Sequence, residues 1–308
     1  MKTKKSVIVL MFLFTLITCT INAQDKTGIL ILAHGGSENW NKTVDEAIEP
    51  LRKDCEVEIA LGMAVPSAMQ EGINNLENKG VNKIVVVQLF ISSYSPIIRQ
   101  NEYLLGLRNE LADEPMLMDH SSTGHENHSS MSHNNDETEL KPLNHKSKIY
   151  LAEPLNDHSL IADILFERIS ELSNTPENET VILVAHGPND EEDNRMWVKT
   201  LDSLADQIRD KNKNYKNIFC MTVRDDAPKE IYEIAKENLR NIVNQASKDG
   251  KAIVVPVLLS QGGIEKGIVK RLEGLNYEWS GKTLLPHTNI TEFIRKSLES
   301  ALEKEGKI

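Results

Sequence analysis

The chain has few cysteines, no phosphate-binding glycine loop and, beyond its first residues, no long apolar run. It has 308 residues and three cysteines. Cys55 and Cys220 lie far apart and have no cysteine or histidine nearby at metal-site spacing, so we expect two buried thiols and no disulfide framework. Gly262 and Gly263 are not followed by the Gly-Lys-Ser/Thr pattern of a nucleotide phosphate loop, so no nucleotide is expected. No later segment predicts a transmembrane helix.

Positive charge is also scarce. The formal net charge is −11 and the isoelectric point is about 5.4. This balance argues against a surface for nucleic acid or anionic membranes. It suits a protein that handles cations, although many ordinary soluble proteins are equally acidic.

The first 23 residues have the layout of a secretory signal peptide. Lysines at positions 2, 4 and 5 precede an apolar run at residues 6–18, and Ile21-Asn22-Ala23 offers small residues at the cleavage positions. The pattern predicts export to the periplasm or another extracytoplasmic compartment. A lipid anchor at Cys19 is the less favoured alternative, because Thr18 is a poor residue before such a cysteine.

An internal repeat organises the rest of the chain. The run Gly28 to Gly35, which ends in Ala-His-Gly, reappears as Val181 to Gly187. Three further landmarks follow in the same order in both halves. They are Val65-Pro66-Ser67 and Ala227-Pro228-Lys229, then Ile84–Ser92 and Ala252–Ser260, then Leu155 and Leu285, each leucine preceding a turn that contains a histidine.

Short apolar runs alternate with longer stretches of helical spacing, such as Ser67–Lys79. Buried strands separated by helices predict parallel sheets covered on both faces. The predicted strands are Ile29–Ala33, Val57–Leu61, Lys83–Phe90, Ile149–Ala152, Val181–Ala185, Ile218–Met221, Ala252–Leu259 and Thr283–Leu285. The expected fold class is α/β, with two tandem doubly wound parallel-sheet repeats at residues 24–173 and 174–308.

The first repeat carries an insertion at about residues 110–148. Its composition is low in apolar residues and rich in Ser, Asn and His, which is typical of a loop that packs no core. We interpret it as an auxiliary metal-binding loop, with His120, His125, His128 and His133 as ligands. Met116, Met118 and Met131 would favour Cu(I) if they take part. The alternative is a flexible polar linker that binds metal only loosely.

His34 and His186 are the candidate catalytic residues. Each follows a predicted buried strand and precedes a glycine, and ligand sites of open α/β sheets form at the carboxyl ends of the strands. An imidazole there can bind a metal ion or accept a proton near neutral pH. A single strand-end histidine is often only a hydrogen-bonded capping residue, and its repetition in both halves makes a functional role the better interpretation.

These features resemble the sirohydrochlorin cobaltochelatases of the class II tetrapyrrole chelatase superfamily. The resemblance rests on Leu32-Ala33-His34-Gly35, on the strand ending in Leu89-Phe90-Ile91-Ser92, and on the duplication. It implies ATP-independent insertion of a divalent metal ion, chiefly Co²⁺ and alternatively Fe²⁺ or Ni²⁺, into a tetrapyrrole such as sirohydrochlorin. Val184-Ala185-His186 and Ser92-Ser93-Tyr94-Ser95 also resemble ferrochelatase.

One departure weakens the enzyme hypothesis. The family usually has a second histidine after the third strand, and Pro96 and Ile264 occupy that position here. Glu265 is one residue later and is a candidate metal ligand beside His34 and His186; the alternative is an ordinary residue of a first helical turn. His158 and His287 each precede a predicted helix, where we favour a capping role.

Two hypotheses follow. In the first, the protein is an exported chelatase; in the second, it is an exported, non-catalytic protein that binds a metal ion or tetrapyrrole. Export counts against the first, because tetrapyrrole synthesis is normally cytoplasmic. The duplication makes a monomer plausible, since the two halves can pair with each other.

Overall fold

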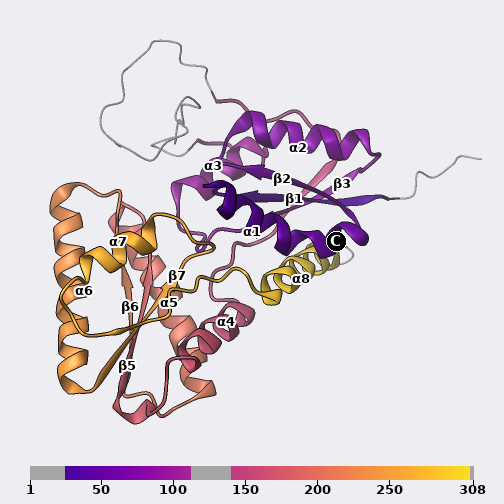
Figure 1. Ribbon diagram of the computed structural model, residues 1–308. Helices are drawn as coiled ribbons and strands as arrows, with labels where there is room; N and C mark the ends of the chain where they lie inside the picture. Colours follow the sequence, from indigo (N-terminus) through magenta and orange to yellow (C-terminus); the bar gives the residue numbers. More distant parts are fainter. Residues whose placement is uncertain (1–24, 112–139, 306–308) are drawn as a thin grey trace, which may run out of the picture.

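Two four-stranded, wholly parallel sheets form the framework of the protein (Figure 1). The computed structural model describes residues 25–111 and 140–305. In the first half the elements are β1 (Thr27–Ala33), α1 (Glu38–Ile48), a 3₁₀ turn η1 (Glu49–Lys53), β2 (Glu56–Leu61), α2 (Pro66–Asn78), β3 (Lys83–Gln88), α3 (Pro96–Leu104), β4 (Lys148–Leu151) and α4 (Ser159–Ser170). In the second they are a 3₁₀ turn η2 (Pro176–Asn178), β5 (Glu179–Ala185), α5 (Glu191–Lys211), β6 (Asn217–Thr222), α6 (Lys229–Asp249), β7 (Lys251–Val257), α7 (Ile264–Arg271), β8 (Glu278–Trp279) and α8 (Thr288–Glu305).

The two sheets repeat one topology. Their strand orders are β2-β1-β3-β4 and β6-β5-β7-β8, and every described strand pair is parallel. The register matches too, since Ile31 pairs with Val87 in the first sheet and Leu183 with Val255 in the second. The predicted α/β fold with two parallel-sheet repeats is therefore confirmed.

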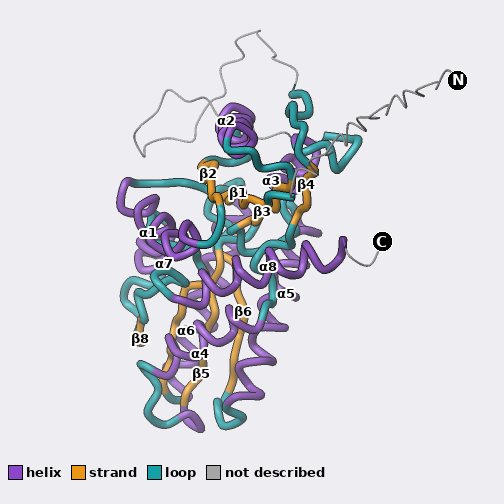
Figure 2. The backbone as a smooth tube through the Cα atoms, turned by 90° about the vertical axis from the view of Figure 1, so that its right-hand side faces the viewer, coloured by secondary structure: helices purple, strands orange, loops and turns teal. Residues whose placement is uncertain are grey.

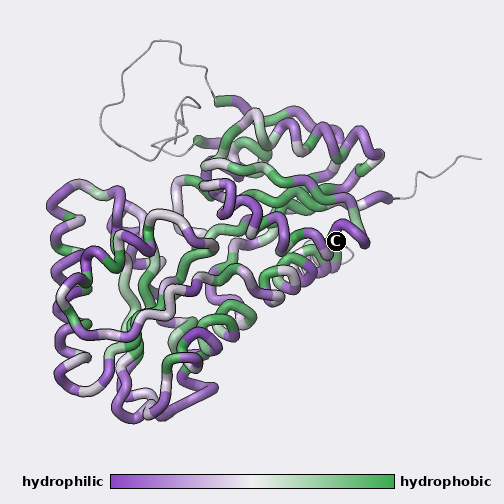
Figure 3. Tube along the Cα trace, viewed as in Figure 1, coloured by the Kyte–Doolittle hydropathy of each residue, from purple (hydrophilic) through white to green (hydrophobic). Residues whose placement is uncertain are grey.

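Strand residues alternate between two cores on opposite faces of each sheet. Figure 3 shows the strands as continuous hydrophobic segments between helices of mixed character. One core of each half is local: α2 and α3 pack with Leu30 of β1, and α6 and α7 pack with Ile182 of β5. The third core is shared by both halves, and it includes Ile29 and Ile31 of β1 together with Leu183 of β5.

The last helix of each half packs against the other half. Helix α4 contacts α5 and β7, whereas α8 contacts α1, η1 and β3, and the two helices contact each other. Figure 2 shows α8 between the two groups of strands. The hydrogen bond from Thr291 Oγ1 to Ala47 O, at 2.6 Å, joins α8 to α1. Because each half supplies a helix to the other, they form one interlocked unit, and the boundary at residue 173 stays a prediction.

One predicted strand is wrong. The segment Thr283–Leu285 is a loop, and the fourth strand of the second sheet is β8. Leu284 N and Leu285 N still donate to Leu258 O and Leu259 O, but these acceptors lie beyond the end of β7. The sequence landmark therefore marks a segment that continues along the sheet after regular pairing has ended.

The C-terminal end of the predicted insertion packs against the first half. Leu143 N donates to Leu104 O, and Ser147 N donates to Glu77 Oε1 at 2.8 Å, so this part follows the surface of α3 and α2. The predicted signal peptide at residues 1–23, Cys19, and the four histidines His120, His125, His128 and His133 lie outside the described residues. Within the described ranges, no helix is both long and apolar enough to cross a membrane.

Candidate functional site

The carboxyl ends of the two sheets converge where the halves meet (Figure 1). The loop after β3 contacts α5, because Trp197 Nε1 donates to Tyr94 O at 2.6 Å. The loop after β7 approaches α1, since a Cβ placed on Gly262 would lie 3.8 Å from Trp40 Cδ1. Each third-strand loop thus meets the first helix of the opposite half. These contacts hold the loops at the carboxyl ends of the two sheets against each other.

A buried ion pair fastens the same boundary. Arg99 of α3 donates to both carboxylate oxygens of Asp193 in α5, at 3.0 and 2.8 Å. The Asp193 side chain is 9% exposed and that of Arg99 is 31% exposed. The hydrogen bonds to Asp193 raise the pKa of Arg99, so the guanidinium remains charged. The pair fixes how the two sets of loops face each other.

His34 lies at the end of β1 and is exposed to solvent. Its Nδ1 lies 2.8 Å from Gly35 O, the carbonyl of the next residue. No ion pair with a carboxylate is formed by His34 within residues 25–111 and 140–305. The ring is free to meet a ligand, but the described protein atoms hold it only weakly.

His186 lies at the equivalent end of β5 and has a carboxylate partner. Its Nε2 is 3.1 Å from Asp226 Oδ2, and the His186 side chain is 27% exposed. Asp226 belongs to the loop after β6, which the buried side chain of Arg224 joins to the loop after His186. Arg224 donates to Pro188 O at 3.1 Å, to Asn189 O, and to the carboxylate of Glu191 at 2.6 Å.

Both histidines precede a glycine that has to be a glycine. Gly35 and Gly187 have φ of 76° and 75°, in the left-handed region. A Cβ on Gly187 would lie 2.4 Å from Thr222 Cβ, which no side-chain adjustment relieves easily. The glycine therefore lets the loop turn directly after the histidine, so that the ring stays at the mouth of the sheet.

Glu265 lies in the first turn of α7. Its Oε1 accepts a hydrogen bond from Gly262 N at 2.5 Å, which places the side chain at the start of α7. Its Oε2 is buried without a hydrogen-bond partner. Glu265 also borders an open groove of about 650 Å³ beside α7, lined further by Lys266, Tyr277 and Trp279. The hydrogen bond to Gly262 N is the contact expected of an ordinary residue in a first helical turn, the alternative to metal binding.

The described residues contain no group of three or more His, Cys, Asp or Glu side chains placed to hold one metal ion. His34, His186 and Glu265 are thus not assembled into a single ready-made site. Pro96 and Ile264 are the first residues of α3 and α7. The position of the missing family histidine therefore lies at a helix start in both halves.

His158 and His287 cap the exchanged helices, as predicted. His158 Nδ1 accepts from Leu160 N at 3.2 Å, and burial lowers the pKa of His158. Its ring meets Phe293 of α8 edge-on, with centroids 5.2 Å apart. His287 Nδ1 accepts from Asn289 N at 3.0 Å. Each capping histidine also contacts the other exchanged helix, because His287 Nε2 lies 2.9 Å from Glu167 Oε2 of α4.

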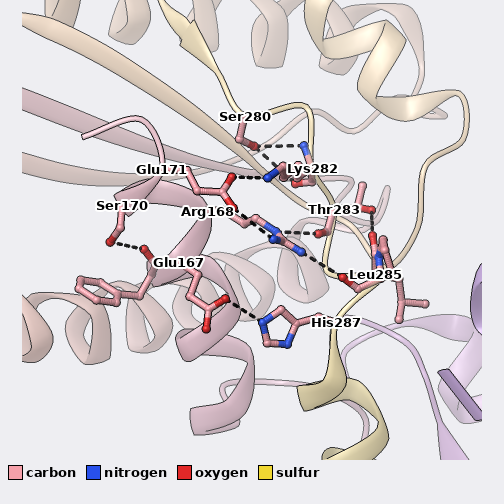
Figure 4. A network of polar contacts seen from close by, with 11 residues as sticks. Glu167, Arg168, Ser170, Glu171, Ser280, Lys282, Thr283, Leu285 and His287 are labelled. Atoms are coloured by element: carbon pink, nitrogen blue, oxygen red, sulfur yellow. Dashed lines mark hydrogen bonds and ion pairs between the residues drawn. The ribbon is translucent and has the colours of Figure 1, made fainter. Parts of the chain in front are cut away.

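Figure 4 shows the network around His287. Arg168 of α4 is buried and donates to Thr283 O and Pro286 O, both at 3.3 Å. Lys282 pairs with Glu171 of the same helix at 2.6 Å. These contacts hold the segment between β8 and α8 against α4. His287 therefore has a structural role, because it caps α8 and pairs with Glu167 of α4.

The sequence analysis missed Asp226 and Arg224. The visible signal was the pair Asp225-Asp226 directly after the second strand of the second repeat, at another carboxyl end of the same sheet. Nothing in the local pattern of Arg224 indicates its left-handed backbone, with φ of 49°, or its burial. Cys55 and Cys220 are free and half-buried, and burial raises the pKa of both thiols.

Comparison with known proteins agrees with this architecture. Residues 28–172, just under half of the chain, match the family model described as CbiX. No curated protein matches the chain.

Three solved structures share the fold of the chain. SirB from Bacillus subtilis, solved with Fe³⁺, has a TM-score of 0.60 at 16% identity over 91% of this chain and 98% of its own. CbiX, described as the terminal enzyme of siroheme biosynthesis in denitrifying bacteria, has a TM-score of 0.52 at 12% identity over 90% and 99%. DR2241 from Deinococcus radiodurans, a multi-domain protein, has a TM-score of 0.50 at 14% identity over 88% and 54%.

Proposed function

We propose that this chelatase-like protein inserts a divalent metal ion into a tetrapyrrole without ATP, with Co²⁺ and sirohydrochlorin as the specific pair. The observation that carries the proposal is the repeated histidine at the carboxyl end of the first strand in both halves. His34 and His186 occupy this position in a fold shared with chelatases. Fe²⁺ and Ni²⁺ are the alternative metal substrates.

The reaction requires few protein groups. Two pyrrole N–H protons leave the macrocycle as the metal ion enters, so a base near the ring assists each departure. The metal ion has to be held by few ligands, because an ion that is fully enclosed by protein is not transferred. One exposed histidine and one histidine with a neighbouring carboxylate meet both requirements.

A non-catalytic role is the second candidate. Pro96 and Ile264 replace the histidine that the resemblance leads one to expect, and the described residues hold no three-ligand cluster. An exported protein that only binds one metal ion or one macrocycle would need neither the second histidine nor a three-ligand cluster. In this alternative, the histidines of the insertion, His120, His125, His128 and His133, would supply most of the metal binding.

Turnover separates the two candidates. Purified protein is mixed with sirohydrochlorin and Co²⁺ without ATP, and visible absorbance is compared with the uncatalysed rate. The chelatase proposal predicts many equivalents of product per protein, and a loss of about 10²–10⁴-fold in rate when His34 and His186 are both replaced by alanine. If the protein binds one equivalent of metal ion or macrocycle and accelerates insertion of none of the three metals, it is the non-catalytic binding protein instead.

Export and the insertion form part of the proposal. Residues 1–23 would direct the protein out of the cytoplasm, and the macrocycle would then be a scavenged one. Deleting residues 121–136 tests the insertion separately. If this deletion abolishes all metal binding while the two histidine replacements change nothing, the site at the strand ends is wrong.

A further inference from the structure

The two repeated histidines differ in their surroundings. His34 is exposed and contacts the carbonyl of its own neighbour, whereas His186 is partly buried and meets Asp226 Oδ2 at 3.1 Å. The loop after β2 offers no matching carboxylate, because Met63, Ala64 and Val65 follow the strand there. The duplication has therefore produced one unsupported histidine and one with a carboxylate partner.

Asp226 is held in place by its loop. Arg224 N donates to His186 O at 2.7 Å, and Asn189 Nδ2 donates to Asp226 O at 3.2 Å. The guanidinium of Arg224 adds contacts to two carbonyls and one carboxylate of the loop after His186. These bonds join the loop that carries the histidine to the loop that carries the carboxylate, so the pair does not depend on two freely moving side chains.

We infer that Asp226 is a positioning residue that sets the tautomer of His186, and that the second half carries the reaction. This inference rests on the proposed function. The Asp226 carboxylate lies 3.1 Å from Nε2, and because an ionised carboxylate has no proton to donate, this close pair favours the ring proton on that nitrogen. Nδ1 then keeps its lone pair, and no hydrogen bond to Nδ1 is formed by the part of the chain that the structure describes.

The free Nδ1 is the atom that meets the substrate. Its lone pair binds the incoming metal ion or takes one pyrrole proton, and Asp226, beside Nε2, holds the ring in the tautomer and orientation that leave Nδ1 available. Each metal insertion releases two protons from the macrocycle. His186 accepts one at Nδ1 and passes it to water, and the second leaves to water, so charge and atoms balance. The described contacts of His34 offer no such support.

The tautomer is measured directly by ¹⁵N NMR of histidine-labelled full-length protein at pH 7.5, with the His186→Gln variant assigning the signal. We expect the Nε2–H form in the wild type and a mixture of tautomers in Asp226→Ala. The Nε2–H form should return in Asp226→Glu. The matched control is Glu192→Gln, which removes a carboxylate that is 81% exposed and pairs only with Arg195. An unchanged tautomer in Asp226→Ala would overturn the assignment.

Kinetics locate the reaction. Asp226→Ala should lower kcat by about 10–100-fold, the usual effect of losing a carboxylate behind a functional histidine, with little change in KM for the macrocycle. His186→Ala should cost more activity than His34→Ala. The reverse order would overturn the choice of half. A wild type with no turnover would refute the proposed function alone, since the NMR comparison still decides whether Asp226 orients His186.

Discussion

The ion pair between Arg99 and Asp193 should be a major contributor to the fit between the two halves. Asp193→Ala removes a carboxylate that is 9% exposed and leaves Arg99, 31% exposed, without its partner. Breaking a fully buried pair costs about 3–5 kcal/mol. Because water reaches part of Arg99, we expect a smaller loss of about 2 kcal/mol in the free energy of unfolding.

A double-mutant cycle with Arg99→Met isolates the interaction, and urea unfolding followed by circular dichroism measures it. We expect a coupling energy of about 1.5–2 kcal/mol, in the range of residues that share a buried contact. The control pair is Lys42 and Glu46, whose side chains are 70% and 58% exposed, and its coupling should be about 0.3 kcal/mol. A coupling for Arg99 and Asp193 no larger than that of the control would refute the argument from burial.

Three further results are expected. Burial lowers the pKa of His158, so the unfolded chain binds a proton at this residue at a higher pH than the folded protein does. The contribution of His158 to the free energy of unfolding is therefore present above pH 6.5 and is lost as pH falls below that value. Urea midpoints should decrease over this pH range, and the decrease should be smaller in His158→Asn. Gly187→Ala should lower the free energy of unfolding by at least about 2 kcal/mol, because of the φ of Gly187 and the nearby Cβ of Thr222. Gly274 has φ of 82° with open space around it, so Gly274→Ala should lower it by about 1 kcal/mol. Equal losses of stability in thermal unfolding would contradict the steric argument. Phe293→Ala should speed hydrogen exchange in β3 and β7 together, while Leu239→Ala, in the core of the second half alone, should affect only the second sheet.

Much of the fold could be predicted because buried parallel strands leave a strong local signal. Seven predicted strands match observed ones to within a few residues, and Pro66 begins α2 as expected. The repeat made the equivalent position of His34 and His186 visible without any structure. The strand prediction for Thr283–Leu285 was wrong because this apolar segment forms backbone hydrogen bonds beyond the end of β7. No local sequence pattern distinguishes such a segment from a strand.

Contacts between segments that lie far apart in the chain could not be predicted from the sequence. The exchange of α4 and α8 depends on which sheet each amphipathic helix covers, and the apolar pattern of a helix does not say which sheet it faces. Asp226 lies forty residues after His186 and meets it only because two strand ends are neighbours in the sheet. Glu265 had the right chemistry for a ligand, but its position in the first turn of α7 directs it to Gly262 N.

The most direct test of the account is the rate of Co²⁺ insertion into sirohydrochlorin, measured by visible absorbance without ATP for the wild type and for His186→Ala. We expect multiple turnovers for the wild type and a loss of about 10²–10⁴-fold for the variant, because the variant lacks the histidine that has a carboxylate partner. A wild-type rate equal to the uncatalysed rate, or a variant as fast as the wild type, would contradict it.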